Sequence, residues 1–159
     1  MVILSCLRAV LSKLPQPVVY AVSLLLFWPT VLVTRIRNLL SPSSHRLWDR
    51  VHPNVMIGVL PLVEGDVETL VKDHNVRTVV NMCREWRGHP RAYDRLGVHH
   101  VRLPTVDFCV PTMEHCRKAV DAMTAATEAG HTAYVHCKAG KGRSLIAVLC
   151  FLVVRAGMT

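Results

Sequence analysis

Cys137 and Arg143 are separated by five residues, two of which are glycines. An apolar run ends just before Cys137 and another follows Arg143, which predicts a strand, a tight loop and a helix. The backbone N–H groups of such a loop can point inward around one phosphate, and the helix adds the positive end of its dipole. Arg143 can bind two phosphate oxygens through its planar fork. The segment is therefore predicted to bind a phosphate group.

Cys137 would lie at the base of this loop, in a field that favours the thiolate. Comparable sites lower the pKa of a cysteine from ~8.5 into the range ~3.5–7.5. A thiolate beneath a bound phosphate is a nucleophile for phosphoryl transfer. A buried structural cysteine would not account for the arginine or for Ser144 after it. A nucleotide P-loop does not fit, because Val135 and Gly142 stand where that motif needs Gly and Ser or Thr.

The string from His136 to Ser144, His-Cys-x5-Arg-Ser, resembles the signature of the cysteine-dependent protein tyrosine and dual-specificity phosphatases. Stretches within 47–62, 75–80 and 102–107 resemble the mitochondrial protein-tyrosine-phosphatase-like branch, which includes a phosphatidylglycerophosphate phosphatase. The resemblance implies an α/β fold of the dual-specificity-phosphatase type. A central mixed sheet would be flanked by helices, with an apolar segment at the N-terminus.

The resemblance also implies roles for the other site residues. Asp107 matches the family's Thr-Val-Asp and would protonate the leaving oxygen, then activate water. Ser144 would hydrogen-bond the sulfur of Cys137, and His136 would order the loop. The alternatives are that Asp107 is a solvated or helix-capping residue and that Ser144 caps the following helix. The expected phosphate-binding residues are Lys138, Ala139, Gly140, Lys141, Gly142 and Arg143.

Two loop lysines bear on the substrate. Lys138 and Lys141 are expected to add positive charge to the rim of the loop. A phospholipid head group can carry a second phosphate, so extra cations stabilise its binding more than that of a phosphotyrosine peptide. The alternative is that the lysines only attract anions in general.

Residues 83–87 are expected to border the active site. The branch usually carries an acidic stretch around an aromatic residue here, and Glu85 and Trp86 keep that pattern. Arg84 and Arg87 instead reverse two charges. This departure leaves the lipid specificity open or tunes it toward a more anionic head group.

The positive charge is unevenly distributed along the chain. The 159 residues carry a formal net charge of +8, and residues 1–48 contain five basic and no acidic residues. Residues 17–34 are uncharged and lie near the lower length limit for crossing a bilayer as a helix. Pro29 is expected to kink or shorten that helix. We expect residues 1–40 to form a membrane anchor, a mitochondrial targeting segment or both; a cleaved secretory signal and a buried helix are the alternatives.

Residues 41–54 are predicted to be a linker and 55–159 the phosphatase domain, lacking the family's C-terminal helices. Apolar surface around Leu149, Leu152 and Val153 would then be exposed. Asp66 is expected to cap the first helix of the domain, and the last helix to be buried behind the loop. The predicted strands are 55–58, 76–82, 98–103 and 132–136, and the predicted helices are 66–74, 112–129 and 145–154.

No metal or organic cofactor is expected, since the cysteines and histidines form no recognised ligand spacing. A catalytic thiolate needs a reducing compartment, and we expect association with the mitochondrial inner membrane. A nucleic-acid partner is not expected. The leading hypothesis is hydrolysis of phosphatidylglycerophosphate or a related anionic phospholipid. The alternatives are a dual-specificity phosphatase acting on phosphoproteins and a truncated, catalytically weak phosphate-binding protein.

Overall fold

The computed structural model describes residues 14–155 and 157, so residues 1–13 of the basic N-terminal stretch lie outside the described residues. A five-stranded sheet has the order β1-β2-β5-β3-β4. Only β1 is antiparallel to its neighbour. The strands are β1 (Trp48–His52), β2 (Val55–Gly58), β3 (Val76–Cys83), β4 (His99–Thr105) and β5 (Thr132–His136).

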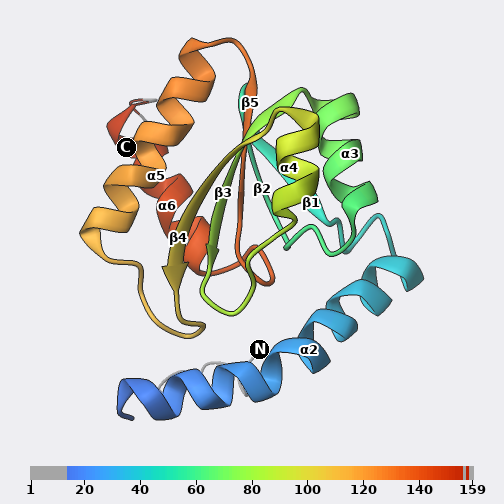
Figure 1. The fold of residues 1–159 in the computed structure, drawn as a ribbon, viewed down its shortest axis with the longest axis vertical. Coiled ribbons are helices and arrows are strands. Elements are labelled where there is room, and N and C mark those ends of the chain that lie inside the picture. The colour runs from blue at the N-terminus through green and yellow to red at the C-terminus, as the bar shows by residue number, and fades with distance from the viewer. Residues whose placement is uncertain (1–13, 156, 158–159) are drawn as a thin grey trace.

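The described helices form two layers around the sheet and one element at its end (Figure 1). α3 and α4 cover one face, α5 and α6 cover the other, and α2 crosses the end toward which the parallel strands point. This arrangement confirms the predicted α/β fold with a central mixed sheet. The helices are α2 (Gln16–Leu40), α3 (Glu64–His74), α4 (Pro90–Leu96), α5 (Met113–Glu128) and α6 (Arg143–Val154).

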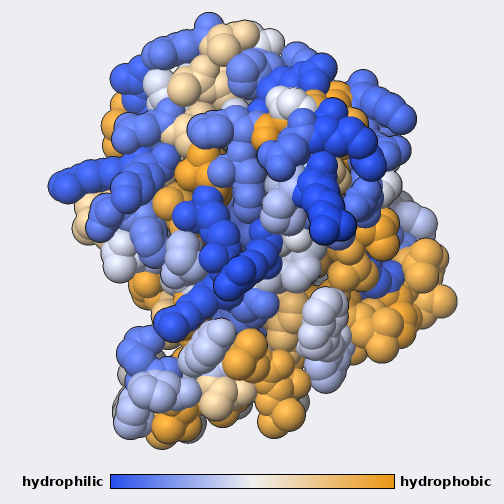
Figure 2. Space-filling view, viewed as in Figure 1, coloured by the Kyte–Doolittle hydropathy of each residue, from blue (hydrophilic) through white to orange (hydrophobic). Residues whose placement is uncertain are grey.

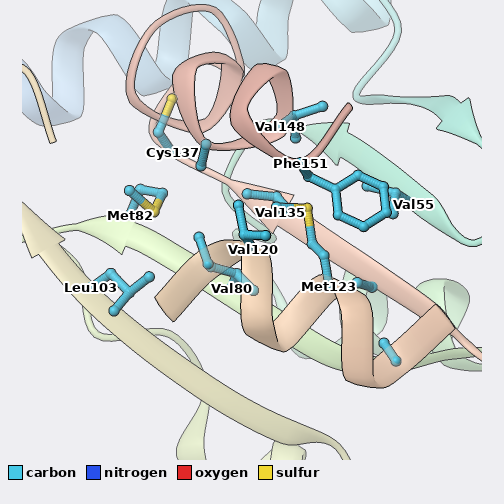
Figure 3. Packing of buried hydrophobic residues seen from close by; sticks show 14 of the residues in the cluster. Val55, Val80, Met82, Leu103, Val120, Met123, Val135, Cys137, Val148 and Phe151 are labelled. Carbon is cyan, nitrogen blue, oxygen red and sulfur yellow. The ribbon is translucent and has the colours of Figure 1, made fainter. Parts of the chain in front are cut away.

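The larger core cluster lies between the sheet and α5 and α6 (Figure 3). Strand β5 is buried at every position because it is covered on both faces. That is why its sequence is a nearly continuous apolar run. Cys137 lies at the edge of this cluster, where β5 ends and the turn into α6 begins. The core therefore fixes the base of the predicted phosphate loop.

Two boundaries differ from those expected. The segment 41–54 is not simply a linker, because it contains β1, which pairs with β2 from Trp48↔Gly58 onward. This edge strand is mostly exposed, so it lacks the apolar pattern of an interior strand. Helix α3 begins at Glu64, and Asp66 is not its N-cap but lies in its first turn. The Asp66 carboxylate accepts the Leu62 N–H at 2.7 Å.

Helix α2 runs through Pro29 to Leu40 instead of ending near the proline. Proline removes one backbone hydrogen bond, but Phe27 and Val31, on either side of it, are both buried against Leu60. Packing thus holds both halves of the helix on one surface. Of the two effects expected of Pro29, a kink or a shortening, the shortening is wrong for this reason.

Helix α6 buries one face behind the loop, through Ala147, Val148 and Phe151. Its opposite face is exposed, with Leu149 at 50% and Val153 at 58% exposure. The helix is therefore only half-buried. The predicted apolar exposure is confirmed at these two residues but is wrong for Leu152, which is half-buried against the core cluster.

Candidate active site

The loop between β5 and α6 is held against the end of β2. Ala139 forms a bridge with Val59, and the Leu60 N–H donates to the Lys138 carbonyl at 3.4 Å. Gly140 has φ +71°, and a Cβ there would lie 2.9 Å from the Gly58 carbonyl carbon. Only glycine meets both conditions without strain. The two strands therefore fix the backbone of the loop.

The Cys137 sulfur is buried and accepts hydrogen bonds at the start of α6. The Ser144 hydroxyl donates to it at 3.2 Å, and the backbone N–H groups of Gly142 and Ser144 also contribute. Burial alone would raise the pKa of Cys137. The Arg143 guanidinium and these hydrogen bonds outweigh burial and hold the pKa below its ordinary value. The site thus favours a thiolate at this position.

Arg143 is buried at the first position of α6. Its Nη1 donates to the Thr105 carbonyl at 2.6 Å and to Glu85 Oε2 at 2.8 Å. Its Nη2 lies 3.1 Å from Asp107 Oδ1. Among the described residues, Nε and Nη2 make no hydrogen bond. These two N–H donors form one edge of the guanidinium fork, which can bind two oxygens of one phosphate group.

Asp107 follows β4 and faces the same arginine. It forms ion pairs with Arg143 and Lys138. Burial would raise the pKa of Asp107, but Arg143 and Lys138 outweigh burial and lower it below its usual range. The next residue, Phe108, has φ +66°, a conformation costly for a bulky residue. The structure therefore holds an ionised carboxylate beside the arginine, on a strained turn.

The two loop lysines lie in different environments. Lys138 is buried, pairs with Asp107 and places Nζ 5.4 Å from the centroid of the Phe108 ring. Lys141 is exposed. The expectation that both lysines add charge to the rim is wrong for Lys138, because its charge is directed inward to Asp107.

His136 is fully buried below the loop, where its Nδ1 lies 3.4 Å from the Cys137 carbonyl oxygen. Burial lowers the pKa of His136 to about 3, so the ring is neutral at physiological pH. The Trp86 ring meets it edge-on at 5.8 Å between centroids. The structure places the histidine under the loop backbone, between the loop and the core.

The sequence placed Glu85 only in a segment expected to border the site, without a role, and did not assign Ser23 to the site. The Glu85 side chain is fully buried, and its Oε1 accepts the Asp107 N–H at 2.7 Å. Ser23, on α2, lies 3.2 Å from the same oxygen. In the sequence, the only signs of these roles are a single serine within an apolar run and a single acidic residue between two arginines.

The described residues contain no group of three or more His, Cys, Asp or Glu side chains placed to hold a metal ion. The side chains that converge are a thiol, a guanidinium, a carboxylate and a hydroxyl. A nucleophile below an anion-binding loop, with a carboxylate beside it, can carry out phosphoryl transfer.

Comparisons with known proteins agree with this chemistry. The family described as "Polymorphic toxin system, DSP-PTPase phosphatase" matches residues 62–157. The chain is 38% identical over 135 residues to human "Phosphatidylglycerophosphatase and protein-tyrosine phosphatase 1", covering 80% of this chain and 67% of that protein. It is 36% identical over 137 residues to "Phosphatidylglycerophosphate phosphatase PTPMT1" of Arabidopsis thaliana, covering 84% of this chain and 40% of that protein.

Solved structures show the same likeness. The crystal structure of PTPMT1 in complex with PI(5)P superimposes with a TM-score of 0.62 at 32% identity. The match covers 67% of this chain and 72% of the other.

Proposed function

We propose that this chain, which belongs to the DSP-PTPase family of phosphatases, hydrolyses the phosphomonoester of phosphatidylglycerophosphate or a related anionic phospholipid. The family makes the chain a phosphoric monoester hydrolase. One observation carries the proposal: the Cys137 sulfur lies 3.2 Å from the Ser144 hydroxyl, at the start of the helix that also holds the buried Arg143. The names of the human and Arabidopsis relatives support a lipid substrate.

In the first step the Cys137 thiolate attacks phosphorus, and the bond from phosphorus to the leaving alkoxide breaks. Asp107 protonates the leaving oxygen, while Arg143 and the loop N–H groups hold the equatorial oxygens. Asp107 is ionised beside its two cations in the unliganded site. A bound phosphate dianion offsets those cations, which raises the pKa of Asp107 and allows it to carry the proton.

In the second step water attacks the phosphorus of the cysteinyl-phosphate, and the phosphorus–sulfur bond breaks. Asp107, now ionised, accepts the proton of that water. The electron pair returns to sulfur, where the Ser144 hydroxyl stabilises the thiolate at 3.2 Å. Phosphate leaves and the site is restored.

We further infer that α2 lies in the surface of a membrane. By length and composition it could cross a bilayer. However, its contacts with the domain run from Gln16, at Cys109, to Arg35, at Asp66. A helix docked along most of its length lies parallel to the surface it joins, which suits an interfacial helix more than a spanning one.

The outer face of α2 supports this orientation. Apolar side chains gather along the edge where α2 lies, and polar ones cover the surface just beside it (Figure 2). Embedding this face in the head-group region would place the phosphate loop at the level of lipid phosphates. The exposed apolar residues include Leu24, Leu25, Trp28, Leu32, Val33, Ile36, Leu39 and Leu40.

The proposed location is the mitochondrial inner membrane. Support comes from the basic, acid-free stretch of residues 1–48, which contains the apolar helix. Import of the chain into isolated mitochondria, followed by carbonate extraction and protease protection, tests it. Failure to enter the organelle would contradict the location without affecting the reaction.

Phosphate release from detergent–lipid micelles tests the reaction. Phosphatidylglycerophosphate, a set of phosphoinositides and a phosphotyrosine peptide are compared, with Cys137→Ser as the blank. We expect lipid turnover well above both the blank and the peptide. Faster turnover of the peptide would favour a protein phosphatase. Phosphate binding without turnover of any substrate would favour a binding protein.

A further inference from the structure

A cationic cavity lies beside the catalytic arginine, on the far side of Glu85. It is open to solvent, has a volume of about 510 Å³ and is lined by Tyr20, Arg84, Glu85, Arg87, Arg102 and Pro104. We propose that this cavity binds a second phosphate group of the substrate, the phosphodiester of the phospholipid whose phosphomonoester occupies the Cys137 loop. The proposal rests on the proposed function and adds the residues that select a two-phosphate head group.

The three arginines of the cavity carry charge that the described part of the chain does not neutralise. Ion pairs form elsewhere among the described residues, but none includes Arg84, Arg87 or Arg102. All three residues are exposed. Three like charges around one hollow repel each other, and an anion placed among them is stabilised. Guanidinium groups also bind phosphate oxygens through paired N–H donors.

Glu85 lines the cavity, but its carboxylate is already committed. Its Oε2 accepts from Arg143 at 2.8 Å, and its Oε1 accepts the Asp107 N–H at 2.7 Å. The side chain is fully buried. The only acidic residue in the lining therefore directs its charge toward the catalytic loop and leaves the three arginines without a counter-ion.

Two of the arginines are held in place. The Arg84 guanidinium carbon lies 4.5 Å from the centroid of the Tyr20 ring. Arg102 donates to the Arg84 carbonyl at 3.2 Å. Because Tyr20 belongs to α2, the cavity forms only where that helix docks. A site ordered in this way loses less side-chain entropy when it binds an anion.

The cavity and the catalytic site share one backbone carbonyl. The Thr105 oxygen accepts from Arg143 Nη1 at 2.6 Å and from the Arg84 N–H at 3.2 Å. The two anion sites are therefore neighbours, separated by the backbone that precedes Asp107. A glycerol unit with a phosphate at each end has the chemistry to occupy both, its monoester at Cys137 and its diester among the arginines.

Two soluble substrates isolate this contact: monomeric dihexanoyl phosphatidylglycerophosphate, with two phosphates, and dihexanoyl phosphatidic acid, with one. The variant R84Q/R87Q/R102Q is compared with R77Q/R91Q/R117Q, which removes the same charge from other exposed positions. We expect the first variant to lower kcat/KM roughly 30-fold on the two-phosphate substrate, mainly through KM, as for the loss of charge-assisted contacts. The same variant should change kcat/KM on the one-phosphate substrate by less than about threefold, and so should the control variant on either substrate, as expected from the long-range field alone.

An equal loss on both substrates would overturn the proposal in favour of general attraction of anions, and so would no loss on either. If the variant lowers kcat/KM only with vesicles rich in phosphatidylglycerol, and not with monomeric substrate, the arginines bind a neighbouring lipid and the proposal is overturned. R87Q alone should show a smaller loss in the same direction and R87K should restore binding, which excludes misfolding as the cause. Wild-type turnover of the two-phosphate lipid no faster than Cys137→Ser would refute the proposed function itself, independently of these ratios.

Discussion

The hydroxyl of Ser23, on helix α2, lies 3.2 Å from the buried carboxylate of Glu85. Glu85 in turn binds Arg143 at 2.8 Å and the backbone N–H of Asp107 at 2.7 Å. One carboxylate therefore joins α2 to the arginine proposed to bind phosphate and to the aspartate proposed as the acid. The docking of the helix and the geometry of the site are coupled through this residue.

Glu85→Gln should lower kcat/KM about 10- to 100-fold, because it removes the buried counter-ion of Arg143 while keeping the size of the side chain. Ser23→Ala should change the rate by less than about threefold, since Glu85 keeps its two other partners, and should lower the free energy of unfolding by about 1 kcal/mol. Steady-state kinetics measures kcat/KM of the two variants, and urea denaturation measures their free energy of unfolding. Equal kinetic effects of the two variants would show that Glu85 does not position the arginine.

Asp107→Asn should reduce turnover of a lipid phosphate, which has an alkoxide leaving group, by ~10²–10⁴-fold. An aryl phosphate with an acidic phenol needs no proton, so its first step should be nearly unaffected. Burst kinetics with p-nitrophenyl phosphate separates the two steps. An unchanged rate with the lipid would show that another group is the acid.

Ser144→Ala should raise the pKa of Cys137, because the hydroxyl that stabilises the thiolate at 3.2 Å is removed. The wild-type pKa lies below the ordinary value, so alkylation of Cys137 by iodoacetamide should persist at pH values where an ordinary thiol is protonated. As the pH is lowered, Cys137 of the variant should stop reacting with iodoacetamide at a higher pH than Cys137 of the wild type. Mass spectrometry of the Cys137 peptide measures this, with the half-buried Cys109 as internal reference.

His136 should destabilise the fold in acid. Its pKa is lowered to about 3 by burial, whereas the unfolded chain takes up the proton near pH 6.5. The neutral ring makes its full contribution to the free energy of unfolding above pH 6.5. Below that pH the contribution falls by roughly 1.4 kcal/mol per pH unit, down to about pH 3. His100, whose pKa burial also lowers, adds in the same direction.

Urea denaturation at pH 6.5 and pH 4.5 measures this slope, and His136→Asn should reduce it. The chemical shifts of the ring nitrogens in wild type give a second measurement. They should remain those of neutral imidazole down to about pH 4, one unit above the folded-state pKa. A ring that protonates near pH 6.5 would contradict the burial of this histidine.

Gly140→Ala should abolish turnover, whereas Gly130→Ala should not. Both glycines have positive φ, +71° and +74°, so both variants carry strain of about 1–2 kcal/mol. A Cβ at position 140 also meets the Gly58 backbone at 2.9 Å, while a Cβ at 130 meets nothing within 4 Å. Thermal unfolding measures the backbone strain that the two variants share. Lipid turnover measures the displacement of the loop, which only Gly140→Ala causes.

Local pattern was sufficient for the catalytic loop and for the interior strands. The loop follows from residue types over 136–144, and β5 follows from an apolar run that is buried on both faces. The edge strand β1 was missed because its exposed, polar residues resemble a linker. Pairing with β2, rather than its own composition, makes it a strand.

Contacts between distant segments could not be predicted from the sequence. The direction of Lys138 depends on Asp107, which reaches it from another strand end. The burial of Glu85 depends on α2 covering it through Ser23. In each case the side chain has several possible partners along the chain, and only the packed fold selects one.

The close approach of Gly140 to Gly58 has a consequence for sequence variation. A side chain at 140 would meet the Gly58 backbone, and one at 58 would meet the Leu47 carbonyl and the Tyr134 hydroxyl. Neither position can enlarge unless its surroundings change first, so substitutions that are harmful singly become tolerable only in a set order. Across related chains both positions should therefore remain glycine, position 140 because of the Gly58 backbone and position 58 because of Leu47 and Tyr134.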